Sequence, residues 1–129
     1  MIRKANIEDI KEIYKLIEIF ANKGEMLHRP LTDMYDNLRD FYVYEENGNI
    51  LGSCALHIIW EDMAEIRSLT VKEEVSGKGV GSALVNTCLD EARILGIKKI
   101  FALTYKPAFF EKLGFMSIDK MTLPHKIWG

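Results

Sequence analysis

Apolar residues recur along the chain with two different spacings, and these spacings predict the order of helices and strands. In residues 7–20 and 84–95 an apolar side chain returns every third or fourth position, which is the period of one helix face. Two shorter segments, 32–38 and 107–113, predict short helices. Runs rich in β-branched, aromatic and aliphatic residues predict the strands, which are 2–5, 41–45, 50–60, 63–71 and 99–104.

Polar residues and glycines mark the ends of these elements. Asn6 is a typical cap for the first long helix, and Thr32 is the expected cap of the second helix. Residues 46–49, Glu-Asn-Gly-Asn, predict a hairpin turn. Residues 115–128 predict one broken strand or two short ones. The predicted order is therefore β-α-α-β-β-β-α-β-α-β.

Composition and charge narrow the class of protein. The chain has 129 residues, which is the size of a single domain, 1–129. Its net charge is −2 with both signs interspersed, which argues against nucleic acid as a partner. It contains no apolar run approaching the roughly 18 residues of a membrane span and no signal-peptide pattern. Cys54 and Cys88 are far from any C-x-x-C spacing, so we expect buried thiols, no metal site and a cytoplasmic protein.

Three glycines at alternate positions, Gly77, Gly79 and Gly81, lie between a predicted strand and the start of a predicted helix. Glycine allows a ligand to approach the main chain, and free N–H groups at a helix start bind anions. The spacing does not fit the Walker A loop, and the dinucleotide fingerprint fails because its third glycine would fall at Ser82. The loop therefore predicts a cofactor that carries phosphate, although a glycine-rich turn without a ligand is the alternative.

The same loop resembles the R/Q-x-x-G-x-G/A signature of the GNAT superfamily of N-acetyltransferases, with Ser76 in place of the usual Gln or Arg. Residues 110–115, Phe-Glu-Lys-Leu-Gly-Phe, resemble the Y-E-K-L-G-F segment of these domains. The resemblance covers essentially the whole chain. It implies a mixed α/β fold, with a twisted mixed sheet of six to seven strands and about four helices. It also implies acetyl-CoA as cofactor, bound by Leu69, Thr70, Val71, Ser76, Gly77, Lys78, Gly79, Val80, Gly81, Ser82 and Phe110.

The resemblance implies three catalytic candidates. A backbone N–H near Leu69 is the expected donor to the oxyanion, and Glu65 is the expected general base. A solvated Glu65 paired with Arg67 is the alternative, with Glu61 and His57 as other bases. Phe110 stands where many family members have a tyrosine that acts as general acid towards the leaving sulfur. Tyr105 either takes over this role or is an ordinary packing residue.

The acceptor is expected to be an amino acid. Arg29, followed by Pro30, suits capture of a carboxylate, although a surface arginine is the alternative. The segments 24–31, 64–69, 102–105 and 123–128 resemble the acetyltransferase domain of the N-acetylglutamate synthases, in their short stand-alone form. That resemblance implies transfer to L-glutamate, the first step towards arginine. A second anchor for its two carboxylates stays open among Arg67, Lys106, Lys112 and Lys126.

Two other functions remain open at this point. One is a GNAT enzyme that acetylates a polyamine, an antibiotic or a peptide N-terminus. The other is a non-catalytic module that senses acetyl-CoA. Pairing of the final strands between two subunits would give a homodimer, which the sequence does not decide.

Overall fold

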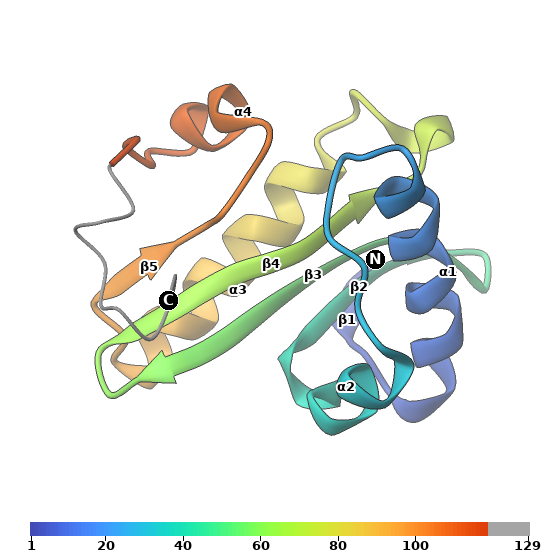
Figure 1. Cartoon of the computed structure of the whole chain (residues 1–129), viewed down its shortest axis with the longest axis horizontal. Helices are drawn as coiled ribbons and strands as arrows, with labels where there is room; N and C mark the ends of the chain where they lie inside the picture. Colours follow the sequence, from blue (N-terminus) through green and yellow to red (C-terminus); the bar gives the residue numbers. More distant parts are fainter. Residues whose placement is uncertain (119–129) are drawn as a thin grey trace.

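The computed structural model describes residues 1–118, which form one five-stranded sheet with helices on both faces (Figure 1). The strands lie in chain order, and β5 alone runs parallel to its neighbour. The strands are β1 (Ile2–Lys4), β2 (Phe41–Glu46), β3 (Asn49–Trp60), β4 (Met63–Val71) and β5 (Lys99–Phe101). The helices are α1 (Ile10–Asn22), α2 (Leu31–Asp36), α3 (Val80–Leu95) and α4 (Pro107–Lys112).

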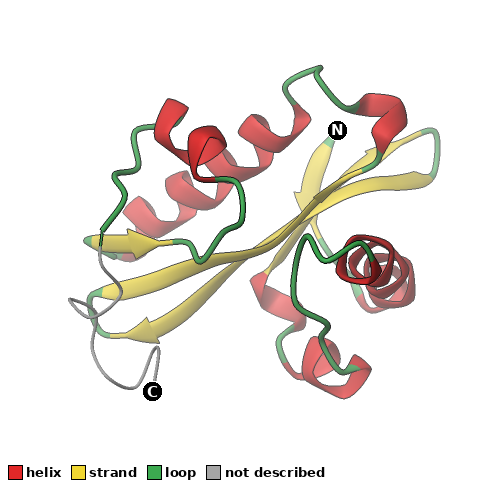
Figure 2. Ribbon diagram, turned by 45° about the horizontal axis from the view of Figure 1, so that its top comes forward, coloured by secondary structure: helices red, strands yellow, loops and turns green. Residues whose placement is uncertain are grey.

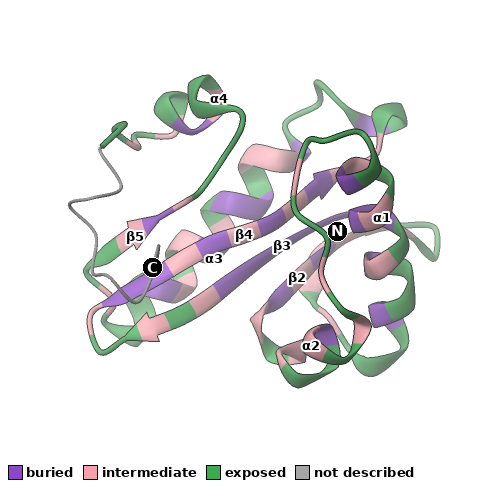
Figure 3. Ribbon diagram, in the orientation of Figure 1, coloured by how far each residue is buried: buried purple, intermediate pink, exposed green. Residues whose placement is uncertain are grey.

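The sheet separates two hydrophobic layers (Figures 2 and 3). On one face α1 and α2 pack over alternate residues of β2 and β3, with Ile13, Met34 and Phe41 among the fully buried side chains. On the other face α3 and α4 pack over the intervening residues of β3 and β4. Because neighbouring strand residues point to opposite faces, each long strand contributes to both layers. No helix of residues 1–118 is long and apolar enough to cross a membrane.

The local signals at the turns are confirmed. Asn47 and Gly48 adopt φ values of 52° and 81° between β2 and β3, as a two-residue hairpin turn requires. The carboxylate of Asp9 accepts the Asn6 N–H at 2.8 Å, so it supports the start of the first helical segment. Gly96 stops α3 at φ 83°, a left-handed conformation that glycine adopts without strain.

Three boundaries differ from the sequence prediction. Helix α2 begins at Leu31 after Pro30, so Thr32 lies inside it and is not its cap. Strand β5 ends at Phe101, three residues early, because its parallel pairing with β4 covers only Lys99–Phe101. Residues 115–118 are not a strand, and the rest of the predicted final strand lies outside the described residues, so the described sheet has five strands, compared with the predicted six to seven.

Candidate active site

A bulge interrupts β4 close to the site predicted for acetyl transfer. The pairing with β3 skips one position there, so that Cys54 faces both Ser68 and Leu69. Ser68 has a φ of 57°, a left-handed conformation that residues other than glycine seldom adopt. A bulge leaves its extra residue outside the regular ladder and bends the strand. The Leu69 N–H, predicted as the oxyanion donor, therefore belongs to the bulge.

Two buried hydroxyl groups hold the bulge in place. Ser53 Oγ lies 2.9 Å from the carbonyl oxygen of Ser68 and 2.7 Å from Thr70 Oγ1. A carbonyl oxygen only accepts, so Ser53 donates to it, and the Thr70 hydroxyl donates to Ser53. Ser53 and Thr70 are both buried. These two bonds fix the backbone of the bulge from the side of β3.

Arg29 joins the loop before α2 to the same bulge. Its Nη1 donates to Ser68 Oγ at 2.9 Å, while Nε and Nη2 donate to Asp33 Oδ2 at 3.0 and 2.8 Å. Its guanidinium lies 5.1 Å from the ring centre of Phe41. The Arg29 side chain is only 10% exposed, so the surface-arginine alternative is wrong. A guanidinium has five N–H donors, and two of them remain for a bound anion.

Glu65 and Arg67 lie two residues apart on β4, with side chains on one face of the sheet. Glu65 Oε1 is 3.8 Å from Arg67 Nη1, too far for a hydrogen bond, and the Glu65 side chain is 14% exposed. Burial raises the pKa of Glu65, although Arg67, His57 and Arg29 oppose the shift. This is the direction that suits a base working near neutral pH.

The guanidinium of Arg67 is incompletely paired. Burial, followed by repulsion from Arg29, lowers its pKa. Within residues 1–118, Arg67 Nε is the single buried side-chain nitrogen or oxygen without a hydrogen-bond partner. Buried polar groups are nearly always paired in folded proteins, so an unpaired donor beside two other charged side chains indicates a place for a ligand.

A histidine–carboxylate pair completes this polar cluster. His57 on β3 is the direct cross-strand partner of Glu65. Its Nδ1 lies 2.6 Å from Oδ2 of Asp40, at the end of the 3-10 turn Leu38–Asp40. Glu61, the other base considered from the sequence, lies in the exposed turn between β3 and β4.

The glycine loop forms an open backbone cradle at the start of α3. Gly77 and Gly79 have φ values of 77° and 84°, and the space where their side chains would stand is empty to 4 Å. The first N–H groups of a helix have no partner inside it, and here they belong to Val80, Gly81 and Ser82. Ser76 and Lys78 are exposed beside them. This arrangement fits a pyrophosphate.

Gly81 has a packing role that differs from that of the other two glycines. A Cβ at this position would lie 3.4 Å from the ring of Phe109 and 3.5 Å from Val71 Cγ2. The start of α3, the end of β4 and helix α4 therefore meet closely at Gly81.

The remaining predicted residues lie away from the polar cluster. Phe110 is buried in the core on the α3 side, with edge-to-face contacts to Phe109 and Phe115. Tyr105 is 65% exposed. Lys106 is exposed, with Nζ 4.0 Å from Glu25 Oε2. Lys112 is exposed at the end of α4, and Lys126 lies outside the described residues.

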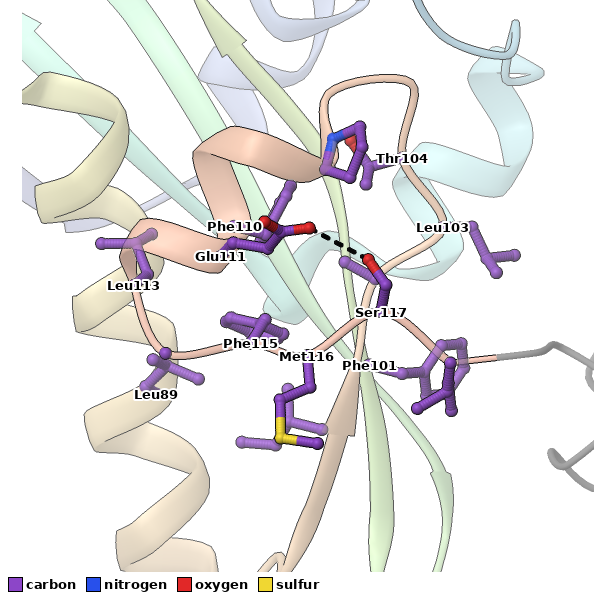
Figure 4. Close-up of a pocket in the computed structure, with 15 residues that line it drawn as sticks. Leu89, Phe101, Leu103, Thr104, Phe110, Glu111, Leu113, Phe115, Met116 and Ser117 are labelled. Carbon is purple, nitrogen blue, oxygen red and sulfur yellow. Dashed lines mark hydrogen bonds between the residues drawn. The ribbon is translucent and has the colours of Figure 1, made fainter.

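A cavity of about 510 Å³ lies between β5, α3, α4 and residues 113–118 (Figure 4). Most of its lining side chains are apolar, and a hydrogen bond of 3.1 Å joins Ser117 to Glu111 beside it. Glu65, Arg29 and Arg67 do not line it. The cavity can hold apolar groups, and it is separate from the polar cluster.

Sequence reasoning missed four parts of the site: the bulge, the Ser53–Thr70 pair, Asp33 and Asp40. Ser53 did carry a signal, because it is a polar residue within the buried run of β3. The bulge and Asp40 depend on contacts between separate elements, which no local pattern marks. Asp33 lies four residues after Arg29 and pairs with it, a spacing that is visible in the sequence.

Comparison with known proteins identifies the family. The model of the acetyltransferase (GNAT) family matches residues 7–115. An uncharacterized N-acetyltransferase of Chlorobaculum tepidum is 35% identical over 98% of this chain and 82% of its own. The amino-acid acetyltransferase of Mycobacterium tuberculosis is 34% identical over 92% of this chain and 70% of its own.

Solved structures agree with this result. A Mycobacterium tuberculosis protein in complex with CoA and NLQ superposes with a TM-score of 0.90 at 32% identity, covering 98% of this chain and 78% of that one. N-acetylglutamate synthase from Neisseria gonorrhoeae, complexed with coenzyme A and N-acetyl-glutamate, gives a TM-score of 0.93 at 31% identity. This chain covers only 30% of the latter, so the likeness concerns one part of a longer protein.

Proposed function

Since the chain belongs to the acetyltransferase (GNAT) family and is an acyltransferase that uses acetyl-CoA, we propose that its acceptor is the α-amine of L-glutamate. The product, N-acetyl-L-glutamate, serves arginine biosynthesis. The observation that carries the proposal is the pair of guanidinium groups, Arg29 and Arg67, beside the half-buried Glu65. Relatives named amino-acid acetyltransferase, at 34% identity, support an amino acid as acceptor.

The donor side of the site is built mainly from backbone. Acetyl-CoA supplies an activated acetyl thioester. The N–H groups at the start of α3 bind its pyrophosphate, with Ser76 and Lys78 at the edge of the cradle. Residues 69–71 of β4 line its pantetheine arm, and the Leu69 N–H at the bulge donates to the acetyl oxygen as negative charge develops there.

The acceptor side is built from charged side chains. Glutamate carries two carboxylates, and the site offers two cations with unused donors. Arg29 has two free N–H groups after its bonds to Asp33 and Ser68, and Arg67 has the unpaired Nε. Each can take one carboxylate through charge-assisted hydrogen bonds. Lys106 stays at the exposed rim, where Glu25 already lies near it.

Glu65 removes the proton that makes the amine unreactive. The acceptor arrives as an ammonium ion, which has no lone pair for attack. A carboxylate with a raised pKa is a stronger base than an ordinary one, and burial gives Glu65 that property. The thiol of coenzyme A resembles a cysteine thiol, with a pKa of about 8.5. The thiolate can therefore leave with help from water, and Tyr105 has no necessary role.

The acceptor is tested by measuring thiol release from acetyl-CoA with each amino acid, spermidine, an aminoglycoside and short peptides. We expect glutamate to be the best substrate. Glutamine has the same length but one carboxylate fewer, so its kcat/KM should be at least about tenfold lower, the loss of one ionic anchor. A better acceptor from another class, or binding of acetyl-CoA without turnover, would overturn the proposal.

Arg29→Gln tests the anchor directly. It should raise KM for glutamate at least about tenfold and leave KM for acetyl-CoA nearly unchanged, because one charged hydrogen-bonding partner is lost. Arg93→Gln is the matched control, since Arg93 is exposed on α3 with Asp90 as its partner. Equal effects of Arg29→Gln on both KM values would remove Arg29 from the acceptor site.

A further inference from the structure

The pair His57–Asp40 lies beside Glu65 but contributes neither to binding of the donor nor to the carboxylate anchors. We propose that this pair carries the proton from Glu65 to solvent after each acetyl transfer. The proposal rests on the proposed role of Glu65 as general base. His57 then acts through Glu65, as a positioning and relay residue that does not itself touch the substrate.

The sheet register places the two side chains together. His57 and Glu65 are direct cross-strand partners, so both project from the same face. Directly opposite residues of an antiparallel pair have Cβ atoms about 4.5–5.5 Å apart. The carboxylate of Glu65 and the imidazole of His57 are therefore within reach of each other, directly or through one water molecule.

Asp40 fixes the orientation and the tautomer of the imidazole. Its Oδ2 lies 2.6 Å from His57 Nδ1, and an ionised carboxylate can only accept a hydrogen bond. Nδ1 therefore carries a proton, and in the neutral ring Nε2 keeps its lone pair. Nε2 is thus ready to accept a proton from the protonated Glu65.

Exposure increases along the proposed route. The side chain of Glu65 is 14% exposed, and that of His57 is 26% exposed. An acceptor held between Arg29 and Arg67 would cover Glu65 further. A base enclosed in this way needs a path for its proton, and imidazole exchanges protons readily near neutral pH.

The proton balance of the cycle is complete. The ammonium group of the acceptor gives one proton to the Glu65 carboxylate, and the freed amine attacks the thioester carbon. As the C–N bond forms and the C–S bond breaks, the nitrogen loses its second proton through water to the departing thiolate, so that coenzyme A is released as the thiol. The Glu65 carboxylic acid passes that proton to His57 Nε2, which regenerates the carboxylate and forms an imidazolium stabilised by Asp40. Water then takes the Nε2 proton, and the neutral ring with Nδ1–H is restored.

Charged side chains of both signs face His57 from the neighbouring elements. Glu65 and Arg67 face it from β4, and Asp40 holds it from the 3-10 turn. Asp33 of α2 and Arg29 of the preceding loop complete the group. Carboxylates and guanidinium groups therefore surround the imidazole, and Asp40 is the one in hydrogen-bonding contact with it.

His57→Ala, tested with added imidazole, separates a relay from a structural role. We expect the variant to lower kcat by about tenfold, less than the roughly hundredfold or more of a direct general base, because water can replace part of the relay. Free imidazole should restore part of the loss in proportion to its neutral form, and KM for acetyl-CoA should stay unchanged. His28→Ala is the matched control, because His28 pairs with Glu18 at 3.0 Å with its side chain 57% exposed. Its activity should match that of the wild type with and without imidazole.

The outcomes distinguish the relay from the proposed base. A large loss in Glu65→Gln, together with wild-type turnover of His57→Ala, would leave the base in place and overturn the relay. If kcat falls in His57→Ala and imidazole does not restore it, the pair is structural and the relay is overturned. The same holds if the fall in kcat is accompanied by an equal loss of thermal stability in His57→Ala and in His57→Gln. Full activity of Glu65→Gln would overturn the base itself. If another acceptor proves better than glutamate, the same measurements apply to that acceptor, because the relay depends on Glu65 and not on the carboxylate anchors.

Discussion

Replacing Ser53 by alanine removes one hydroxyl that supports the bulge of β4. In the native protein this hydroxyl donates to the carbonyl oxygen of Ser68 and accepts from the Thr70 hydroxyl. Ser53 and Thr70 have 0% and 2% exposure, so water cannot easily replace the lost bonds. The substitution therefore leaves a buried acceptor and a buried donor without partners.

The expected loss of stability follows from these two groups. A buried polar group left unsatisfied costs about 1–3 kcal/mol. The Thr70 hydroxyl can rotate towards another acceptor, whereas the Ser68 carbonyl is fixed by the backbone, so we expect a total of about 2 kcal/mol. For a domain of 129 residues this corresponds to a fall in Tm of about 7 °C. A shift of the bulge would also move the Leu69 N–H, and we expect kcat to fall about tenfold.

The test combines thermal unfolding by circular dichroism with steady-state kinetics. Thr87→Ala is the matched control, because its hydroxyl also donates to a carbonyl, that of Ala83 at 2.8 Å, but on the exposed surface of α3. This control should stay within about 0.5 kcal/mol of the wild type. If Ser53→Ala unfolds at the wild-type temperature and keeps its kcat, the hydroxyl pair does not hold the bulge, and the assignment of Leu69 loses its structural support.

Two further predictions concern the glycine loop and the N-terminal ion pair. Gly81→Val should raise KM for acetyl-CoA at least about tenfold, because the new methyl groups would displace Phe109 and Val71 from the start of α3. Ala83→Val, on the exposed side of the same helix, is the control and should leave that KM unchanged. An unchanged KM in Gly81→Val would exclude close packing at Gly81 as a requirement for binding. Arg3 donates a hydrogen bond to Asp9 at 2.7 Å and lowers the pKa of that carboxyl. The pair therefore stabilises the fold fully above the ordinary Asp pKa of about 3.9. This stabilisation is lost as the pH falls through the lowered pKa of Asp9. Arg3→Gln should therefore lower the free energy of unfolding by about 2 kcal/mol at pH 7, as measured by urea titration. In the variant, the free energy of unfolding should also fall less steeply as the pH is lowered. An equally steep fall would show that the Arg3–Asp9 pair does not cause it.

The parts of the fold that were predictable are those with strong local signals. The period of α3 and its two flanking glycines, like the Asn47-Gly48 turn, encode structure within a few residues of sequence. The bulge at Ser68 has no such code, because it arises from a mismatch in pairing between β3 and β4. The early end of β5 has the same origin, since residues 102–104 have strand-like composition but no pairing with β4.

The residues of the candidate site also divide into those with a local signal in the sequence and those without one. The glycine loop and the raised pKa of Glu65 could be expected from neighbouring residues alone. The hydrogen bond from Arg29 to Ser68 joins residues 39 positions apart, and sequence reasoning could name Arg29 without finding the partner that positions it. Side-chain contacts of this kind follow from the packing of α2 against the sheet.

The unpaired Nε of Arg67 distinguishes a binding role from a structural one. Arg29 and Arg67 lie close enough for their charges to repel, and burial adds to the cost of holding both. An arginine kept only for stability would be expected to have its donors paired, as Arg29 does with Asp33 and Ser68. Arg67 instead has Glu65 at 3.8 Å, too distant for a hydrogen bond, and a buried nitrogen with no partner among residues 1–118. A second anion that arrives with the acceptor would both pair this donor and reduce the repulsion between the two guanidinium groups. This pair of like charges, with Arg29 mostly buried and Arg67 half-buried, therefore argues for a substrate with negative charge. It argues against a polyamine, whose cations would add to the same repulsion.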